Sequence, residues 1–156
     1  MGESGEKWEM LFLGTYKHII DEKNRLSLPA KLVGKFSHRV VVASKGFEGC
    51  LELRSQEDFE VWSGQILSYS QNKKDSRILA RQILANSSEI ELDKANRILI
   101  PDVLTKLASL KKNVIIIGLG NKLEVWDAKA YAKFQAETDS KFEAVAERID
   151  DENSAK

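Results

Sequence analysis

The stretch Asp21-Glu-Lys-Asn-Arg-Leu-Ser-Leu-Pro29 occurs a second time, in diverged form, as Asp93-Lys-Ala-Asn-Arg-Ile-Leu-Ile-Pro101. The shift from Asp21 to Asp93 is 72 residues, and the match continues without a gap as far as Trp62 and Phe134. The chain has only two prolines, and both stand at the same position of the repeat. The sequence therefore predicts an internal duplication, the mark of a repeat architecture.

Each copy of the stretch predicts two short strands joined by a turn. Strands are expected to lead into the turn at 15–20 and 89–92, the second of these indicated by alternation of polar and apolar residues, and strands are expected to leave it at 25–28 and 97–100. Asp accepts backbone N–H bonds in a turn, and Asn tolerates a positive φ. We therefore expect the tips of two β-hairpins at 21–25 and 93–97, with an arginine directly after each turn.

The rest of each copy predicts two further strands and a helix. Apolar runs indicate strands at 39–43 and 113–117, followed by strands at 50–53 and 122–125. Ser55 and Asp127 hold equivalent positions, and both residue types favour a helix N-cap. A linker helix is expected at about 59–84, with a break near 68–72.

The last predicted helix covers about 128–149. Three- and four-residue steps place apolar side chains on one face of it. These residues are Tyr131, Phe134, Thr138, Phe142, Val145 and Ile149. The face either packs on its own domain or contacts another subunit, and the sequence leaves both interpretations open.

The size of the repeats constrains the fold. A unit of ~45 residues made of short strands is too small to bury an adequate core alone. Two copies related by a pseudo-twofold axis would solve this by interleaving their strands. We therefore predict a mainly β fold with added helices, in which the two repeats build one β-barrel.

Composition and charge exclude several classes of protein. The chain has 156 residues, with 24 basic and 24 acidic side chains, so its net charge is zero. It has no apolar run near the ~18–20 residues of a membrane span, and we expect no membrane segment. The charge is uneven, since residues 14–45 carry +5, residues 93–112 carry +3 and residues 137–156 carry −4. Binding to DNA would depend on basic residues gathered at the duplicated turns.

Catalytic and metal chemistry find little support. Cys50 lies in an apolar strand, where a cysteine is usually a small buried hydrophobe. His18 and His38 have no equivalents in the other copy, and an enzyme using Cys50 with His18 is the remaining catalytic alternative. One cysteine and two histidines offer no spacing typical of a metal site. We predict that the protein is no enzyme and uses no metal or other cofactor.

Arg25 and Arg97 are the most informative residues. They could pair with Asp21 and Asp93 merely to stiffen the turns. They could instead present a guanidinium to DNA, either to a guanine edge or to a phosphate. An exposed Asp–Arg pair contributes only about 0–1 kcal/mol to stability, which explains poorly why both copies keep it, so the second interpretation is favoured.

These motifs resemble the MraZ family of bacterial regulators of the division and cell-wall gene cluster. The resemblance spans residues 10–134 and includes Phe12-Leu-Gly-Thr-Tyr16 and Leu123-Glu-Val-Trp126. It implies two SpoVT/AbrB-like repeats, at 15–62 and 87–134, in a double-split barrel with swapped hairpins. The remaining segments are then an extension at 1–9, a linker helix at 63–86, a C-terminal helix at 135–149 and a frayed tail at 150–156.

The resemblance also implies a function. Family members form ring-shaped homo-oligomers that bind short repeated sites in the promoter of their own operon, which places this chain in the cytoplasm at the nucleoid. The expected DNA-binding residues are Arg25, Arg97, Lys23, Asn24, Lys94, Asn96 and Lys17. The family commonly has Gly where this chain has Asn24 and Asn96. An antitoxin-like module that binds a protein instead of DNA is the alternative, and no small-molecule substrate is expected.

Overall fold

The structure is a computed structural model that describes residues 11–154, so the predicted extension at 1–9 lies outside the described residues. The first half contains β1 (Phe12–Ile19), β2 (Arg25–Ser27), α2 (Ala30–Val33), the 3-10 turn η1 (Ser37–Arg39), β3 (Val40–Lys45), β4 (Leu51–Arg54), α3 (Gln56–Ser68) and α4 (Lys74–Leu84). The second half contains β5 (Ser88–Glu91), β6 (Arg97–Leu99), α5 (Asp102–Leu107), β7 (Asn113–Gly120), β8 (Leu123–Asp127), α6 (Ala128–Thr138), the 3-10 turn η2 (Asp139–Lys141) and α7 (Phe142–Ser154). The chain is thus mainly β with several helices, as the sequence predicts.

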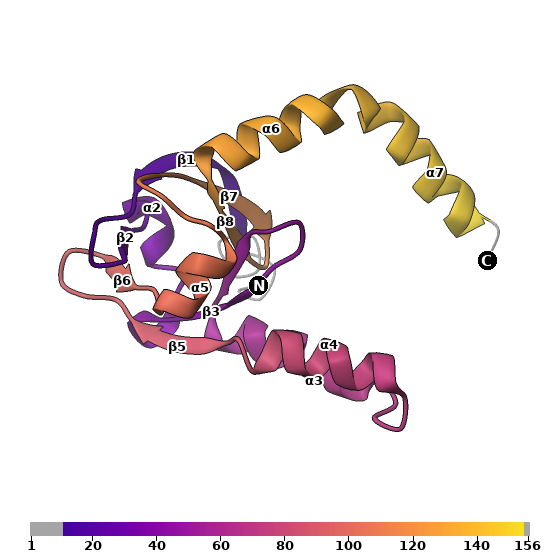
Figure 1. Cartoon of the computed structure of the whole chain (residues 1–156), viewed down its shortest axis with the longest axis horizontal. Coiled ribbons are helices and arrows are strands. Elements are labelled where there is room, and N and C mark those ends of the chain that lie inside the picture. The colour runs from indigo at the N-terminus through magenta and orange to yellow at the C-terminus, as the bar shows by residue number, and fades with distance from the viewer. Residues whose placement is uncertain (1–10, 155–156) are drawn as a thin grey trace, which may run out of the picture.

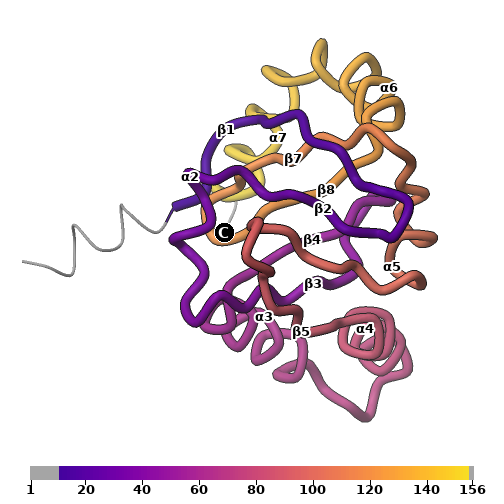
Figure 2. Tube along the Cα trace, turned by 90° about the vertical axis from the view of Figure 1, so that its left-hand side faces the viewer, coloured from indigo at the N-terminus to yellow at the C-terminus, as the bar shows by residue number. Residues whose placement is uncertain are grey.

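The strands form two antiparallel sheets. The larger sheet has six strands in the order β1-β7-β8-β4-β3-β5, and the smaller one pairs β2 with β6 (Figures 1 and 2). The first strand of each repeat pairs with a strand of the other repeat, since β1 lies beside β7 and β5 lies beside β3. The two repeats therefore share their sheets.

The register of the pairing has pseudo-twofold symmetry. In the larger sheet, β4 and β8 meet at the centre, where Glu52 faces Glu124. In the smaller sheet, Leu26 faces Ile98. Each of these pairs joins positions that are 72 residues apart, which is the shift of the sequence repeat. The predicted interleaving of the two copies is thus visible in the strand register.

Two sequence-based expectations differ from the structure. β1 and β2 meet only at the bridge between Ile20 and Leu26, and β5 and β6 also lie in different sheets. The segments at 21–25 and 93–97 are therefore turns between strands of different sheets and not the tips of regular hairpins. Among residues 11–154, the larger sheet ends at β1 and β5, and no closed barrel is found. The regular hairpins are absent because β2 and β6, the strands that leave the two turns, pair with each other across the repeats.

The core lies between the two sheets and uses equivalent positions of both repeats. Leu26 and Ile98 are fully buried, as are Leu51 and Leu123 in the central strands. The short helices contribute the equivalent leucines Leu32 in α2 and Leu104 in α5, each 1% exposed. Burial of one such side chain stabilises the fold by about 1.5–3 kcal/mol.

A buried ionic cluster sits on the pseudo-twofold axis of the larger sheet. The carboxylate of Glu52 accepts Nη1 of Arg54 at 2.7 Å and Nζ of Lys122 at 2.9 Å. The guanidinium of Arg54 lies 4.7 Å from the ring centroid of Trp62 in α3. Both oxygens of the buried carboxylate are thereby satisfied, which is the condition for keeping a charge inside a protein. The cluster thus connects β4 with the start of β8 and with α3.

The helices begin where the sequence predicts. Oγ of Ser55 accepts the backbone N–H of Asp58 at 3.1 Å, and Oδ2 of Asp127 accepts that of Ala130 at 3.3 Å. The predicted break of the linker helix separates α3 from α4. Within residues 11–154, no helix is both long enough and apolar enough to cross a lipid bilayer.

The C-terminal helix differs from its prediction in two ways. It is interrupted at η2, which begins with Asp139 and Ser140, and both residue types have low helix propensity. It also continues to Ser154, beyond the expected end at Ile149 and into the tail that was expected to fray. The predicted face divides accordingly, since Tyr131 and Phe134 pack against Trp126 whereas Phe142 in α7 is 76% exposed.

The smaller sheet should be a stabilising part of the core. We expect Ile98→Ala to lower the free energy of unfolding by about 2–5 kcal/mol, because it removes a fully buried side chain beside Leu26. Its neighbour Leu99 is 59% exposed, and Leu99→Ala should change that free energy by less than about 0.5 kcal/mol. Chemical denaturation of both variants measures the difference. Equal losses would mean that this sheet does not close the core.

Candidate nucleic-acid interface

The first turn is organised by one carboxylate. Oδ1 of Asp21 accepts the backbone N–H of Lys23 and that of Arg25, both at 2.9 Å. Oδ2 of Asp21 accepts Nε of Arg25 at 2.7 Å. A single aspartate thus shapes the backbone of the turn and holds the guanidinium that follows it.

The second turn repeats this arrangement. Oδ1 of Asp93 accepts the backbone N–H of Ala95 at 2.8 Å and that of Arg97 at 2.9 Å. Oδ2 of Asp93 accepts Nε of Arg97 at 2.9 Å. The predicted Asp–Arg pair is therefore present in both copies, with the same atoms in the same roles.

The asparagines explain how the chain closes these turns. Asn24 has φ of 62° and Asn96 has φ of 60°, a left-handed conformation that Asn tolerates better than most residues. The backbone N–H of each asparagine donates to the backbone carbonyl of the aspartate three residues earlier, at 3.0 Å. Asn24 and Asn96 thus supply the left-handed backbone conformation that these turns require.

The two turns are also joined to each other. The N–H of Leu28 donates to the carbonyl of Asn96 at 3.0 Å, and that of Ile100 donates to the carbonyl of Asn24 at 2.9 Å. In the same ribbon, Arg25 faces Leu99 and Arg97 faces Ser27. The structure therefore carries both arginines on one two-stranded sheet, on either side of the buried Leu26–Ile98 pair.

The carboxylates of the two turns have the same electrostatic environment. Backbone N–H bonds, foremost from the arginine itself, hold the pKa of Asp21 and of Asp93 below the usual 3.8, and the guanidinium contacts act in the same direction. Each arginine side chain is 37% exposed. Among the described residues, the hydrogen bonds of each guanidinium use only Nε, so its two terminal nitrogens are available to a ligand.

The lysines have different places. Lys23 and Lys94 are exposed, and they lie in the same turns as Arg25 and Arg97 respectively. Lys17 is exposed in β1, opposite Ile115, and belongs to neither turn. The structure thus groups Lys23 with the first turn and Lys94 with the second.

Arg39 is a residue of the site that the sequence reasoning missed. Its Nη2 donates to the carbonyl of Asp93 at 2.5 Å and to Oδ1 of Asn96 at 3.0 Å. The equivalent residue, Lys111, makes no such bond to the first turn, where Nδ2 of Asn24 instead donates to Oδ1 of Asp102 at 3.4 Å. In the sequence, the one hint of this role is that the equivalent positions carry different basic residues, Arg39 in the first copy and Lys111 in the second. The two turns therefore share a shape but differ in their supports.

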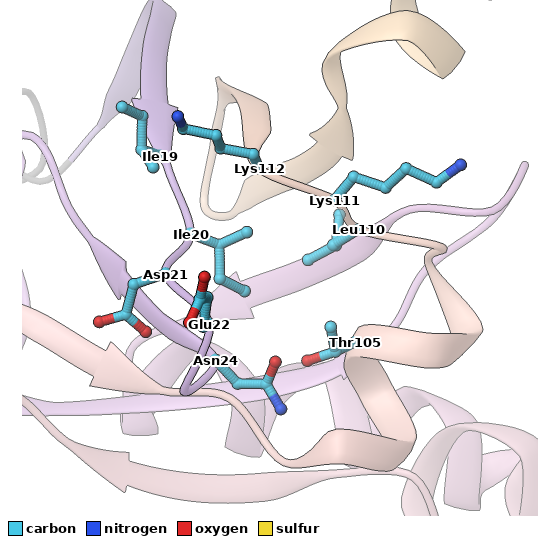
Figure 3. Close-up of a pocket in the computed structure, with 9 residues that line it drawn as sticks. All are labelled: Ile19, Ile20, Asp21, Glu22, Asn24, Thr105, Leu110, Lys111 and Lys112. Atoms are coloured by element: carbon cyan, nitrogen blue, oxygen red, sulfur yellow. The ribbon is translucent and has the colours of Figure 1, made fainter.

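A hollow of about 530 Å³ lies beside the first turn (Figure 3). Its lining residues are Ile19, Ile20, Asp21, Glu22, Asn24, Thr105, Leu110, Lys111 and Lys112. In Figure 3 the ammonium ends of Lys111 and Lys112 extend in opposite directions, away from the hollow. Lys111 is the repeat equivalent of Arg39. At the second turn, Arg39 is hydrogen-bonded to the turn itself.

The residues weighed for catalysis do not form a site. Cys50 is 2% exposed, and its thiol donates to the carbonyl of Phe47 at 3.2 Å. Burial raises the pKa of this thiol, and neither His18 nor His38 hydrogen-bonds to it among the described residues. Within residues 11–154, no three His, Cys, Asp or Glu side chains converge as metal ligands would.

Comparison with known proteins agrees with the duplicated turns. A family model described as an antitoxin-like MraZ protein matches the chain twice, over residues 11–82 and 83–153. The protein belongs to the MraZ family. The two matches start 72 residues apart, which is the shift found in the sequence.

Curated relatives match along most of their length. A protein of Mesoplasma florum is 47% identical over 140 residues, which are 90% of this chain and 96% of the relative. One of Mycoplasmoides gallisepticum is 46% identical over 92% of this chain and 100% of the relative, and one of Thermoanaerobacter pseudethanolicus is 36% identical over 92% and 99%. All three are named "Transcriptional regulator MraZ". These names agree with the prediction that the chain is no enzyme.

Arg39 should be needed for the order of the second turn alone. We expect Arg39→Ala to speed amide hydrogen exchange at residues 95–97 about two- to tenfold, because two hydrogen bonds to that turn are lost. The first turn should exchange as before. Lys111→Ala, at the equivalent position, should leave both turns unchanged. Faster exchange in both turns after Arg39→Ala would assign it a general role in stability.

The turn carboxylates should titrate below pH 3.8. Their pKa is lower in the folded chain than in the unfolded one, so they stabilise the fold above pH 3.8, and this contribution is lost as the pH falls through the folded-state pKa. Carboxyl carbon shifts in an NMR titration measure the midpoints. Arg25→Ala should raise the midpoint of Asp21 only in part, since backbone N–H bonds remain. A midpoint at or above 3.8 in the parent protein would contradict this.

Proposed function

We propose that the protein is a sequence-specific, DNA-binding transcriptional regulator. The observation that carries the proposal is the pair of equivalent turns, in each of which an aspartate holds Nε of an arginine and leaves the terminal nitrogens free. A guanidinium fixed in this way has little conformational entropy left to lose when it binds. The name of the relatives supports the same function.

In the proposed complex, Arg25 and Arg97 contact guanine edges or phosphates. A guanidinium matches N7 and O6 of guanine with two parallel hydrogen bonds. Lys23 and Lys94, exposed in the same turns, contact phosphates, as does Lys17 from β1. Asn24 and Asn96 shape the turns, and the amide of Asn24 is a further candidate for a base contact.

The target we propose is a set of short repeated sites in the promoter of the division and cell-wall operon, bound by a ring-shaped homo-oligomer. One subunit offers few contacts, so useful affinity requires several subunits bound to regularly spaced sites at once. Regulation then consists of steric control of RNA polymerase in the cytoplasm, at the nucleoid. It needs no cofactor and no small-molecule substrate.

Replacing either arginine should weaken binding to DNA from upstream of the protein's own gene. Arg25→Ala or Arg97→Ala removes a contact of about 1–3 kcal/mol, so we expect roughly a 5- to 150-fold higher Kd at fixed salt. Fluorescence anisotropy with labelled promoter DNA measures this. Arg25→Lys keeps the charge but not the two parallel bonds, and should lower specificity more than affinity for random DNA.

The control is Lys133→Ala, which removes a positive charge from an exposed position in α6. It should leave the Kd unchanged, whereas Lys23→Ala should reduce the salt dependence of binding. Circular dichroism confirms that each variant is folded. If the two arginine variants are folded and bind the promoter like the parent, the turns are not the DNA-binding site.

The description of the family model favours one alternative, an antitoxin-like module that binds a protein. It predicts capture of a protein partner through the same fold with no affinity for the promoter DNA. A pull-down beside the DNA titration separates the two. Promoter binding that needs Arg25 and Arg97 excludes the alternative as the sole function.

A further inference from the structure

The hollow beside the first turn lies where the second turn carries a bound side chain. At the second turn, Nη2 of Arg39 donates to the carbonyl of Asp93 and to Oδ1 of Asn96. The same two acceptors exist at the first turn, as the carbonyl of Asp21 and Oδ1 of Asn24, and both residues line the hollow. The second turn therefore shows, within the same chain, that this pair of acceptors binds a guanidinium.

The chain supplies no such group to the first turn. The N–H of Leu92 donates to the carbonyl of Arg39, which fixes the place of this residue in the fold. In the same way, the N–H of Ile20 donates to the carbonyl of Lys112, which therefore holds the corresponding place. Arg39 has a left-handed backbone with φ of 57°, whereas Lys112 is not among the described residues of positive φ. The side chain of Lys112 therefore takes another direction, away from the hollow (Figure 3).

The acceptors of the first turn have capacity for a ligand. Nδ2 of Asn24 donates to Oδ1 of Asp102 at 3.4 Å, and Oδ1 of Asn24 has no donor among residues 11–154. In the same part of the chain, the carbonyl of Asp21 accepts only the N–H of Asn24, while the equivalent carbonyl of Asp93 accepts a second bond. A carbonyl oxygen has two lone pairs, so each of these oxygens can accept one more bond.

Two differences between the copies adapt the hollow to a cation. Glu22 places a carboxylate in the lining, and the equivalent residue of the second copy is Lys94. Among residues 11–154, no group is bonded to this carboxylate. Thr105 places a hydroxyl in the lining, and its equivalent is Val33. Thr105 is 9% exposed, and its Oγ1 donates to the carbonyl of Pro101 at 3.4 Å, so the oxygen can still accept.

The other charged groups of the lining do not oppose a cation inside it. The carboxylate of Asp21 is held by Arg25. The ammonium ends of Lys111 and Lys112 extend away from the hollow (Figure 3). The carboxylate of Glu22 is therefore the one charge of the lining that is neither paired nor directed away.

The size and composition of the hollow suit a small molecule. Its volume of about 530 Å³ lies within the ~300–1,000 Å³ usual for small-ligand sites. Ile20 and Leu110, which are 4% and 9% exposed, give it an apolar wall beside the polar acceptors. A guanidinium is planar and weakly hydrated, with its donors along the edge, so it can contact both the wall and the acceptors.

We propose that this hollow binds a small organic cation that carries a guanidinium group. The guanidinium donates to the carbonyl of Asp21 and to Oδ1 of Asn24, as that of Arg39 does at the second turn. It pairs with the carboxylate of Glu22, and Oγ1 of Thr105 accepts a further bond from the ligand. The bound cation then gives the first turn the support that the second turn receives from its own chain.

The probe for this site is N-acetyl-arginine amide, which presents an arginine side chain without charged backbone groups. Titrated into the full chain at constant ionic strength, it should shift the methyl NMR signals of Ile20 and Leu110 with a Kd on the order of 0.1–1 mM. At saturation it should slow amide exchange at residues 23–25 about two- to tenfold and leave residues 95–97 unchanged, because Arg39 already supports them. N-acetyl-citrulline amide, of the same shape but uncharged, should bind at least about tenfold more weakly.

Two substitutions that copy the second repeat test the lining. Glu22→Lys should abolish detectable binding, because it replaces an attracting charge by a repelling one. Thr105→Val removes an acceptor at similar size and should raise the Kd roughly 3- to 30-fold. Glu60→Lys makes the same change of charge at an exposed position of α3, and should bind the probe like the parent. Circular dichroism confirms that each variant is folded.

Three results would overturn the site. The first is the absence of any shift at Ile20 and Leu110 with about 10 mM probe. The second is binding that the citrulline probe equals or that Glu22→Lys leaves intact. The third is a first turn that, without ligand, exchanges as slowly as the second and faster on dilution, since an arginine of another copy would then fill the hollow. None of these measurements uses DNA, so this site and the proposed function can fail separately.

Discussion

The pairing of β2 with β6 is the constraint on which the rest of the structure depends. Both strands are three residues long, and each pairs as a strand with the other, while the contact of β2 within its own repeat is the single bridge between Leu26 and Ile20. Backbone bonds from Leu28 to Asn96 and from Ile100 to Asn24 close the ribbon at both ends. Because each turn is bonded to the strand that follows the other turn, the two arginines are positioned by one element and not by two independent loops.

The same constraint explains the exchange of strands in the larger sheet. Once β2 has turned toward β6, β1 cannot form a regular hairpin with it and pairs with β7 instead. The equivalent strand β5 pairs with β3 for the same reason. At the centre of this sheet, Glu52 and Glu124 face each other on the axis, and the bonds of Glu52 to Arg54 and Lys122 compensate its buried charge.

The near-symmetry of the fold does not extend to the contacts that side chains make in the two halves. The turns have the same internal bonds, yet the second is held by Arg39 and the first has an open hollow beside it. The central strands differ too, since Arg54 of β4 stacks on Trp62, whereas the equivalent Trp126 of β8 packs against Phe134 and Tyr131. Duplication therefore provided a common frame in which each copy acquired its own contacts.

The sequence by itself determined the duplication, the turns, the helix caps and the residues proposed to meet DNA, because these depend on local chemistry. Asp accepts nearby N–H groups, Asn accepts a positive φ, and Ser55 caps a helix whatever lies around it. Only the tertiary structure decided which strands pair, that Arg39 reaches the second turn across 54 residues, and that α7 is left without a partner in its own chain. Those outcomes depend on contacts between distant segments, which compete with each other and leave no periodic signal in the sequence.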